Sequence, residues 1–371
     1  MDALLASLRT PVAFLVVLGV LVFVHEAGHY LAARWRGVHV ERFAIGFGRP
    51  LARWTDRRDT KWQIGWLPLG GYVKLHGQEQ PGDVDPEIRA TWKPGQTFHD
   101  KPVLDRALVV AAGPAANFLL AILFFAVLFV AVGRPVATAT VGSVVAGSAA
   151  ERAGVLAGDQ ITGLDGQAIG RFEEVQRYIQ PRAGVPVQMQ LRREGRELSL
   201  PITPDSRARG EGTPPVGVLG IAGGAPVFER VDPFTAVVAG VTHTADISWQ
   251  TLAGVWQMIT GQRGTEELGG PLRIAQLSGQ VAELGIASLI TFMAVLSINL
   301  GLINLFPIPV LDGGHLLFYA AEAIRGRPLP PRFLDYGLRA GLAVLAALFL
   351  FSTWNDLSQL GVVRWITGAG G

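Results

Sequence analysis

The chain has 371 residues, of which 49% are hydrophobic and 17% charged, and its formal net charge is +2. Its mean hydropathy is positive, at +0.33. This balance predicts an integral membrane protein with a substantial polar portion, and the small net charge argues against a nucleic-acid partner. The sequence contains no cysteine, so there can be no disulfide bond, and a zinc site would need histidine and carboxylate ligands.

The first apolar segment, from about Ser7 to Ala33, contains an ionisable motif. The motif His25-Glu26-Ala27-Gly28-His29 places two imidazoles on one face of a helix, where both can bind one Zn²⁺. Glu26 can then act as a base toward a water at the metal. Ionisable groups at bilayer depth are costly and usually functional, so we expect an intramembrane zinc protease. A polar contact between helices is the alternative.

Three further segments reach the roughly 20 apolar residues that a membrane span needs. They run from about Leu104 to Val132 with a break at Gly113-Pro114, from Ile286 to Phe306, and from Gly337 to Ser352 with an extension in Leu316–Ile324 packed beside it. Asn117, just after the break, is interpreted as a polar tie between helices. A fifth segment, Pro233 to Ile259, includes polar residues such as His243 and Asp246. We expect one or two amphipathic helices there, on the membrane surface or on the protein, with a true span as the alternative.

Cations are concentrated in two of the connecting segments. Only Arg9 precedes the first span, whereas the basic segments contain Arg34, Arg36, Arg42, Arg49, Arg53, Arg57, Arg58 and Lys61 after the first span, and Arg325, Arg327 and Arg332 between the third and the fourth. Because cytoplasmic loops carry an excess of cations, we expect both segments to be cytoplasmic and both chain termini to be extracytoplasmic. The histidine pair then lies nearer the cytoplasmic face.

The segment between the first two spans lacks helical periodicity. Val40–Gly48 and Trp62–Lys74 are strand-like, and the second contains Pro68-Leu69-Gly70-Gly71 between two apolar halves. Non-helical backbone near membrane depth is tolerated only where protein buries it or a water-filled cavity adjoins it. We therefore expect a membrane-associated β-hairpin that dips toward the histidine pair. A plain surface hairpin is the alternative.

The polar stretch between the second and third spans predicts a small extracytoplasmic α+β domain. Its expected elements are a strand at Ala139–Val145, a short helix at Ser148–Ala153, a strand at Gln160–Leu164, a helix at Phe172–Ile179, and a hairpin of Val185–Arg192 and Glu197–Ile202 around Glu194-Gly195. Residues 147–161 resemble the signature of a PDZ domain, a fold that takes extended peptide ends at a sheet edge. A spacer with no ligand is the alternative.

The predicted architecture is an α-helical polytopic membrane protein with four transmembrane helices, a membrane-associated β-hairpin and one inserted α+β PDZ domain. The expected divisions are residues 1–133 as the first half of the membrane core, 134–228 as the PDZ domain, 229–285 as surface helices and loop, and 286–371 as the second half of the core.

Two histidines leave a third protein ligand to be found, and the end of the third span offers the best candidate. There Asp312 follows the proline-broken run from Asn304 to Leu311, a geometry that can aim a carboxylate into a helix bundle. His315 is a rival ligand, and helix N-capping or a turn would explain Asp312 without a metal. Asn299 and Asn304 could hydrogen-bond an extended substrate or the ligands.

Together these segments resemble the site-2 proteases, bacterial intramembrane zinc metalloproteases, and most closely the branch called regulator of sigma-E protease. The resemblance covers most of the chain and rests on His25-Glu26-x-x-His29, Leu67–Lys74, Gly113–Asn117, the PDZ-like stretch, Gly269–Ala275 and Asn304–His315. It implies these roles: zinc binding by His25, His29 and Asp312, base catalysis by Glu26, and substrate binding by Asn299, Asn304, Gly70, Gly71 and Tyr72. One departure is that the best-known enterobacterial member has two PDZ domains, whereas this chain has room for one.

The resemblance also implies substrates and location. The expected reaction is hydrolysis of peptide bonds in or near transmembrane segments of single-span membrane proteins, such as an anti-sigma factor or remnant signal peptides, in the bacterial inner membrane. A transporter is one alternative, because broken helices and intramembrane Asn and Asp are transporter features, but the chain has no internal repeat. A PDZ-bearing scaffold without protease activity is the other, and the presence of Glu26 argues against it.

Overall fold

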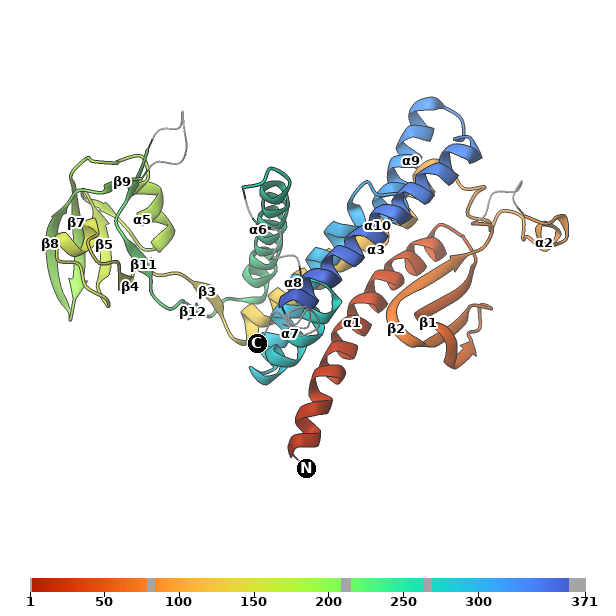
Figure 1. Ribbon diagram of the computed structural model, residues 1–371, viewed down its shortest axis with the longest axis horizontal. Coiled ribbons are helices and arrows are strands. Elements are labelled where there is room, and N and C mark those ends of the chain that lie inside the picture. Colours follow the sequence, from red (N-terminus) through yellow and green to blue (C-terminus); the bar gives the residue numbers. More distant parts are fainter. Residues whose placement is uncertain (1, 79–83, 208–214, 263, 265–268, 360–371) are drawn as a thin grey trace, which may run out of the picture. The chain divides into compact units, whose positions relative to one another are not determined.

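The computed structural model describes residues 2–78, 84–207, 215–262, 264 and 269–359. The chain forms two compact units, one made of Met1–Leu128 with Phe234–Gly371 and the other of Phe129–Pro233. The first unit contains the long helices, and the second is inserted between two of them along the chain (Figure 1). Each unit is therefore described by itself.

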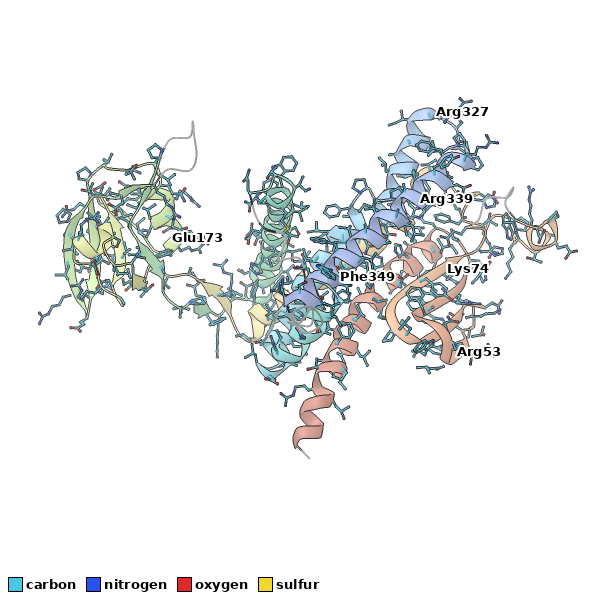
Figure 2. The ribbon with its side chains drawn as sticks, in the orientation of Figure 1. Arg53, Lys74, Glu173, Arg327, Arg339 and Phe349 are labelled. Carbon is cyan, nitrogen blue, oxygen red and sulfur yellow. The ribbon has the colours of Figure 1, made fainter. Side chains whose placement is uncertain are left out.

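Four helices in the described part of the chain are long and apolar enough to cross a membrane, and they confirm the four predicted spans. They are α1 (Asp2–Trp35, apolar from Leu8), α3 (Val103–Ala131), α8 (Ile286–Leu305) and α10 (Pro331–Gln359). Even α8, the shortest with 20 residues, is about 30 Å long at 1.5 Å per residue, which matches the hydrocarbon core of a bilayer. Their outer faces expose large apolar side chains, including Phe349 on α10 (Figure 2), as expected for contact with lipid.

The fourth span is longer than predicted at both ends. Helix α10 begins at Pro331 rather than Gly337 and ends at Gln359 rather than Ser352. The added turns contain charged residues that fall outside an apolar window, but charge does not interrupt helical hydrogen bonding. The predicted neighbouring segment lies in a separate helix, α9 (Asp312–Arg325), whose Phe318 ring packs 6.4 Å from that of Phe333 in α10.

Helices α1 and α3 cross in close contact because both carry glycine at the crossing. A Cβ on Gly28 of α1 would collide with the carbonyl oxygen of Ala112 in α3, and a Cβ on Gly113 would collide with the imidazole of His29. Small residues allow two membrane helices to approach to backbone contact. The break at Gly113-Pro114 therefore lies beside the histidine motif, within one continuous helix.

The segment after α1 forms a hairpin of β1 (Val40–Thr55) and β2 (Lys61–Leu75), followed by the short helix α2 (Pro86–Ala90). The hairpin turn is closed by Asp56, whose carboxylate accepts the backbone N–H of Arg58 at 2.8 Å and of Thr60 at 3.0 Å. The first half of β1 pairs with two separate parts of β2. Phe43, for example, pairs with both Val73 and Trp62. The hairpin is thus strongly curved (Figure 1), and β2 returns against α1.

Both strands are longer than predicted, and the glycine-rich stretch forms a bend inside β2. Gly70 has a φ of +108°, and a Cβ there would lie 2.9 Å from the Phe47 ring. Glycine adopts such a φ without the steric cost that a side chain brings. The bend directs residues 71–75 back along the first half of β1.

The inserted unit is an α+β fold around one four-stranded sheet, with strand order β6-β5-β7-β8. Its elements are β3 (Arg134–Val136), β4 (Val141–Val144), α4 (Ala149–Arg152), β5 (Gln160–Leu164), β6 (Gln167–Ala168), α5 (Phe172–Ile179), β7 (Val187–Arg193), β8 (Arg196–Ile202), β9 (Asp205–Arg207), β10 (Val216–Val218), β11 (Ile221–Gly223) and β12 (Val227–Glu229). Ile161, Leu164, Met189 and Leu191 are fully buried between sheet and helices. Pairing of β3 with β12 holds the two ends of the unit together.

Most of the predicted elements of this unit are present. The β7–β8 hairpin turns at Glu194-Gly195, both with positive φ, as a two-residue turn requires. The predicted first strand is shorter than expected, because only Val141–Val144 pairs with β11, whereas Thr140 makes a single bridge to Gln160.

Two helices connect the inserted unit to α8. The predicted amphipathic segment is a single helix, α6 (Pro233–Ile259), which packs on α3 with its His243 ring 4.6 Å from that of Phe125. Helix α7 (Pro271–Glu283) begins where Asp356 of α10 accepts the backbone N–H groups of Gly270, Leu272 and Arg273 at 2.8–3.1 Å. The Gly269–Ala275 motif is thus the N-terminus of α7, stabilised by a buried carboxylate.

Candidate metal centre

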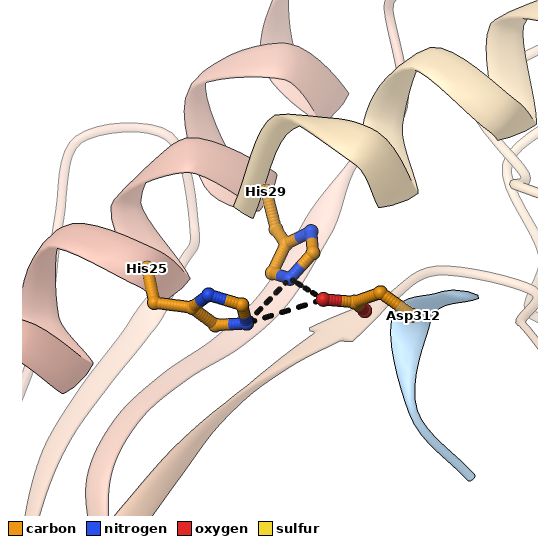
Figure 3. A group of neighbouring side chains, drawn as sticks. All are labelled: His25, His29 and Asp312. Atoms are coloured by element: carbon orange, nitrogen blue, oxygen red, sulfur yellow. Dashed lines mark hydrogen bonds and ion pairs between the residues drawn. The ribbon is translucent and has the colours of Figure 1, made fainter. Parts of the chain in front are cut away.

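Three of the predicted site residues meet at one point between helices (Figure 3). Nε2 of His25 lies 3.2 Å from Nε2 of His29, and Oδ2 of Asp312 lies 3.3 Å from the first and 3.5 Å from the second. Oδ2 of Asp312 is buried and accepts no hydrogen bond from any described residue. Among the described residues these three side chains form a group that could hold a metal ion.

The spacing of the three atoms fits zinc. Ligand atoms on a tetrahedron around Zn²⁺, at bond lengths of about 2.0–2.1 Å, lie about 3.3 Å from one another. The three observed separations, 3.2, 3.3 and 3.5 Å, lie close to that value. An unsatisfied buried carboxylate oxygen aimed at two imidazole nitrogens would be costly without a cation between them. Two nitrogens and one carboxylate leave one position of a tetrahedral site for water or substrate.

The two histidines are adjacent because α1 is a regular helix through the motif. Residues four apart lie on one face of a helix, so both imidazoles project toward α3 and α9. Their ring centroids are 4.8 Å apart, and the two ring planes are nearly perpendicular, at 86°. The place that a side chain of residue 113 would fill is taken by the His29 ring. The glycine of α3 is therefore part of what makes room for the site.

Asp312 is held in place by a tight turn between α8 and α9. Val310 in this turn has a φ of +96°, which a β-branched residue adopts only when its surroundings hold it there. Glycines 313 and 314 pack directly on the carbonyl groups of the turn, and so does Gly341 of α10. Asp312 itself is the first residue of α9, whose N-cap is Leu311. The carboxylate thus points at the histidines and does not cap its helix.

Glu26 is buried beside the triangle and is not part of it. Its side chain is contacted by β2, where a Cβ on Gly71 would lie 3.0 Å from Cγ of Glu26, and Val73 of the same strand lines the same cavity. A buried carboxylate next to a metal centre is placed to exchange a proton with a group at the open metal position.

A cavity of about 750 Å³ opens next to the metal centre. Its lining includes Glu26 and the three candidate ligands, together with Gly71 and Tyr72 of β2 and Asn304 of α8. Its wall also contains the Arg106–Glu322 ion pair, with an N–O distance of 2.6 Å, and His99. The cavity thus joins the ligands to a polar region that water can occupy.

The remaining predicted residues lie elsewhere or make other contacts. Asn299 accepts a hydrogen bond from Thr251 of α6 at 3.2 Å, and the amide of Asn304 donates to the Leu300 carbonyl of its own helix at 3.0 Å. Gly70 packs on the Phe47 ring. His315, the rival ligand, lines the cavity with its ring 6.3 Å from that of Phe318 and stands outside the triangle.

Asn117 is a polar tie between helices, as predicted, but the two contacts to the outer nitrogens of the histidines were not predicted from the sequence. Nδ1 of His29 lies 2.9 Å from the carbonyl oxygen of Val109, and Nδ1 of His25 lies 3.1 Å from the amide nitrogen of Asn117. Both partners belong to α3. The sequence offered one signal: Val109, Gly113 and Asn117 are spaced by four and so share a helix face.

Comparison with known proteins gives consistent matches over nearly the whole chain. The sequence profile of Peptidase family M50 matches residues 13–348. A Rhizobium meliloti protein provisionally named as a zinc metalloprotease is 44% identical over 97% of this chain and 100% of its own length. Metalloprotease MmpA of Caulobacter vibrioides is 39% identical, covering 96% of this chain and 97% of that protein. Protease RseP of Yersinia pestis is 32% identical over 96% of this chain and all of that protein.

A solved structure matches a smaller part of the chain. The PDZ domain of an SdrC-like protein from Listeria monocytogenes is 26% identical, covers 25% of this chain and 93% of that one, and has a TM-score of 0.21.

Proposed function

Because the chain belongs to peptidase family M50, it is a zinc metalloprotease, and we propose that it cuts peptide bonds in or near transmembrane segments with Zn²⁺ held by His25, His29 and Asp312. The observation that carries this assignment is the ligand triangle, with separations of 3.2–3.5 Å and an unsatisfied carboxylate oxygen at one corner. Bound zinc lowers the pKa of water to about 7 and polarises the scissile carbonyl.

The other steps belong to residues of the chain. Glu26 takes the proton of the attacking water and delivers it to the leaving amine. Close packing against Gly71 of β2 keeps the Glu26 side chain in place beside the triangle. The polar wall of the cavity, with Arg106 and Glu322, would let in the water that hydrolysis consumes.

Substrate binding follows from the chemistry of a helical substrate. A helix hides its carbonyl groups in internal hydrogen bonds, so the substrate must unwind before it can be cut. The 71–75 part of β2 lies beside Glu26, and a strand edge there would hold an unwound segment by backbone pairing. We assign Gly71 and Tyr72 to this edge and Gly70 to the bend that leads into it. Asn304, which lines the cavity, and Asn299, five residues before it on α8, complete the proposed substrate-binding set.

The inserted unit is proposed to be a PDZ domain that screens substrates. A groove of about 490 Å³ runs between α5 and the segment 216–221, and Val175, Ile179, Leu219 and Ile221 line it with apolar surface. An extended peptide end fits such a groove between a helix and a strand edge. The alignment with RseP spans 462 positions and this chain has 371 residues, so that relative contains segments that this chain lacks. The proposed screening therefore uses a single domain.

The assignment is tested by metal analysis combined with cleavage of a single-span membrane substrate. Purified wild-type protein is expected to contain one zinc and to cut the substrate. His25→Ala is expected to lose both properties, because two ligands no longer hold the ion firmly. A wild-type protein without zinc, or a His25→Ala variant that retains it, would contradict the proposed site.

The proposed topology is an inner-membrane protein with the hairpin and the metal centre toward the cytoplasm and the inserted unit outside. It rests on the excess of cations in the hairpin segment and in the α9–α10 connection. The substrates proposed on this basis are single-span membrane proteins of the anti-sigma-factor type. We propose that helix α6 packs on the membrane-spanning helices at their extracytoplasmic side.

Single cysteines test this topology without background labelling, because the chain contains none. Arg53 on the hairpin and Glu173 on α5 are both exposed and are labelled in Figure 2. In intact spheroplasts a membrane-impermeant thiol reagent is expected to modify Glu173→Cys and to spare Arg53→Cys until the membrane is opened. Labelling of Arg53→Cys alone in sealed spheroplasts would invert the topology.

A further inference from the structure

One helix, α3, contacts both candidate histidine ligands at Nδ1, the ring nitrogen away from the metal position. Nδ1 of His29 contacts the Val109 carbonyl oxygen at 2.9 Å, and Nδ1 of His25 contacts the Asn117 side-chain amide at 3.1 Å. Asn117 is fully buried. Its backbone carbonyl accepts a hydrogen bond of 2.8 Å from Ser297 of α8, so Asn117 joins α1, α3 and α8.

The two outer contacts differ in chemistry. A histidine that gives the lone pair of Nε2 to a metal carries its proton on Nδ1, so Nδ1 must face an acceptor. The Val109 carbonyl satisfies this need for His29. The atom of Asn117 that faces His25 is the donor Nδ2, while its acceptor Oδ1 is buried with no hydrogen-bond partner among the described residues.

A half-turn of the Asn117 amide removes the mismatch at His25. The two ends of an amide have nearly the same shape, so Oδ1 and Nδ2 can exchange places within the same volume. In the exchanged orientation Oδ1 accepts the Nδ1–H of His25, and the buried oxygen is no longer unsatisfied. The Nε2 lone pair of His25 then points toward His29 and Asp312, where the zinc of the proposed function would be bound.

We propose that Asn117 is a positioning residue of the metal centre: its Oδ1 fixes the tautomer and the ring orientation of His25 so that Nε2 can bind zinc. The inference rests on the proposed zinc site and adds a residue to it. The fold supports it, because Asn117 lies one turn after Gly113, whose missing side chain admits the His29 ring. One face of α3 therefore places both histidines.

The first test compares zinc dissociation constants measured by competition with a chelator. Asn117→Leu, which keeps the approximate size of the side chain but has no acceptor, is expected to weaken zinc binding about 10–100-fold, the usual effect of losing an outer partner of a ligand. Asn117→Asp keeps an acceptor at the same place and is expected to stay within a few-fold of wild type. Ser297→Ala removes a hydrogen bond at the same helix contact without touching His25, and is expected to bind zinc like wild type.

The second test uses the wild-type protein and does not depend on a variant that folds. In the zinc-loaded protein labelled with ¹⁵N-histidine, His25 is expected to show a protonated Nδ1 that exchanges slowly with solvent and a metal-bound Nε2. A metal-bound Nδ1 at His25 would overturn the inference. So would an Asn117→Leu variant with the wild-type zinc constant, or an Asn117→Asp variant as weak as Asn117→Leu.

These outcomes are distinct from failure of the zinc site itself. If His25→Ala binds zinc as wild type does, the proposed site is wrong. If His25→Ala loses zinc while Asn117→Leu keeps the wild-type constant, the site stands and only the role of Asn117 is wrong.

Discussion

Replacement of Glu26 by glutamine is expected to lower the cleavage rate of a membrane substrate about 10²–10⁴-fold, the usual contribution of a general acid–base group. The bound zinc is expected to stay, because no Glu26 atom belongs to the ligand triangle. Glutamine has nearly the same shape and size as glutamate, so the packing against Gly71 and the fold should not change. The measurement is zinc content and single-turnover cleavage on the same purified preparation.

Glu41→Gln provides the matched control. Glu41 lies on β1, where its carboxylate is paired with His76 at 2.8 Å and with Lys74 at 3.3 Å, and it does not line the cavity at the metal centre. Cleavage by this variant is expected to remain near wild type. If Glu26→Gln also cleaved at a near-wild-type rate with zinc bound, another group would have to move the proton.

The spans of this protein could be predicted because their signal is local. Lipid requires an apolar stretch of fixed length, and that requirement is visible in the residues of each helix. The ends of α10 were missed because Arg332 and Asp356 interrupt the apolar pattern without interrupting the helix. Asp356 is buried for a reason outside its own segment, since it accepts three backbone N–H groups at the start of α7.

The hairpin was predicted in outline, but its turn was not located. The residues that close it, Asp56 with its two backbone donors and Asp59 with a φ of +63°, are typical turn residues and were a usable signal. The double pairing of Phe43 with Val73 and Trp62 could not be predicted in the same way. Strand register depends on contacts between segments that are distant in sequence.

In the metal centre, too, the residues of one local motif could be predicted, whereas contacts between distant segments could not. His25, Glu26 and His29 form a motif within one helical turn and a half, so helix geometry alone brings the histidines together. Asn299 illustrates the limit: the hydrogen bond that its side chain accepts from Thr251 of α6 could not be predicted from its own segment. Which neighbour a helical asparagine meets depends on packing between helices and not on its own segment.

The second large effect is expected at Asp312. Asp312→Ala removes one of three ligand atoms and is expected to weaken zinc binding by more than the 10–100-fold typical of an outer partner, so that purified protein contains little zinc and cleaves no substrate. His315→Ala is the matched control, because His315 lies three residues further in α9 and lines the same cavity outside the triangle. Metal analysis and cleavage are measured for both variants.

The comparison discriminates between the two ligand candidates because both substitutions remove a side chain from the same helix and the same cavity wall. His315→Ala is expected to keep zinc, since its ring packs toward Phe318 and the three atoms of the triangle already leave a single open position. If His315→Ala loses zinc and Asp312→Ala retains it, the carboxylate is not the third ligand. The turn at Val310 would then need another explanation for its positive φ, because its geometry aims Asp312 at the histidines.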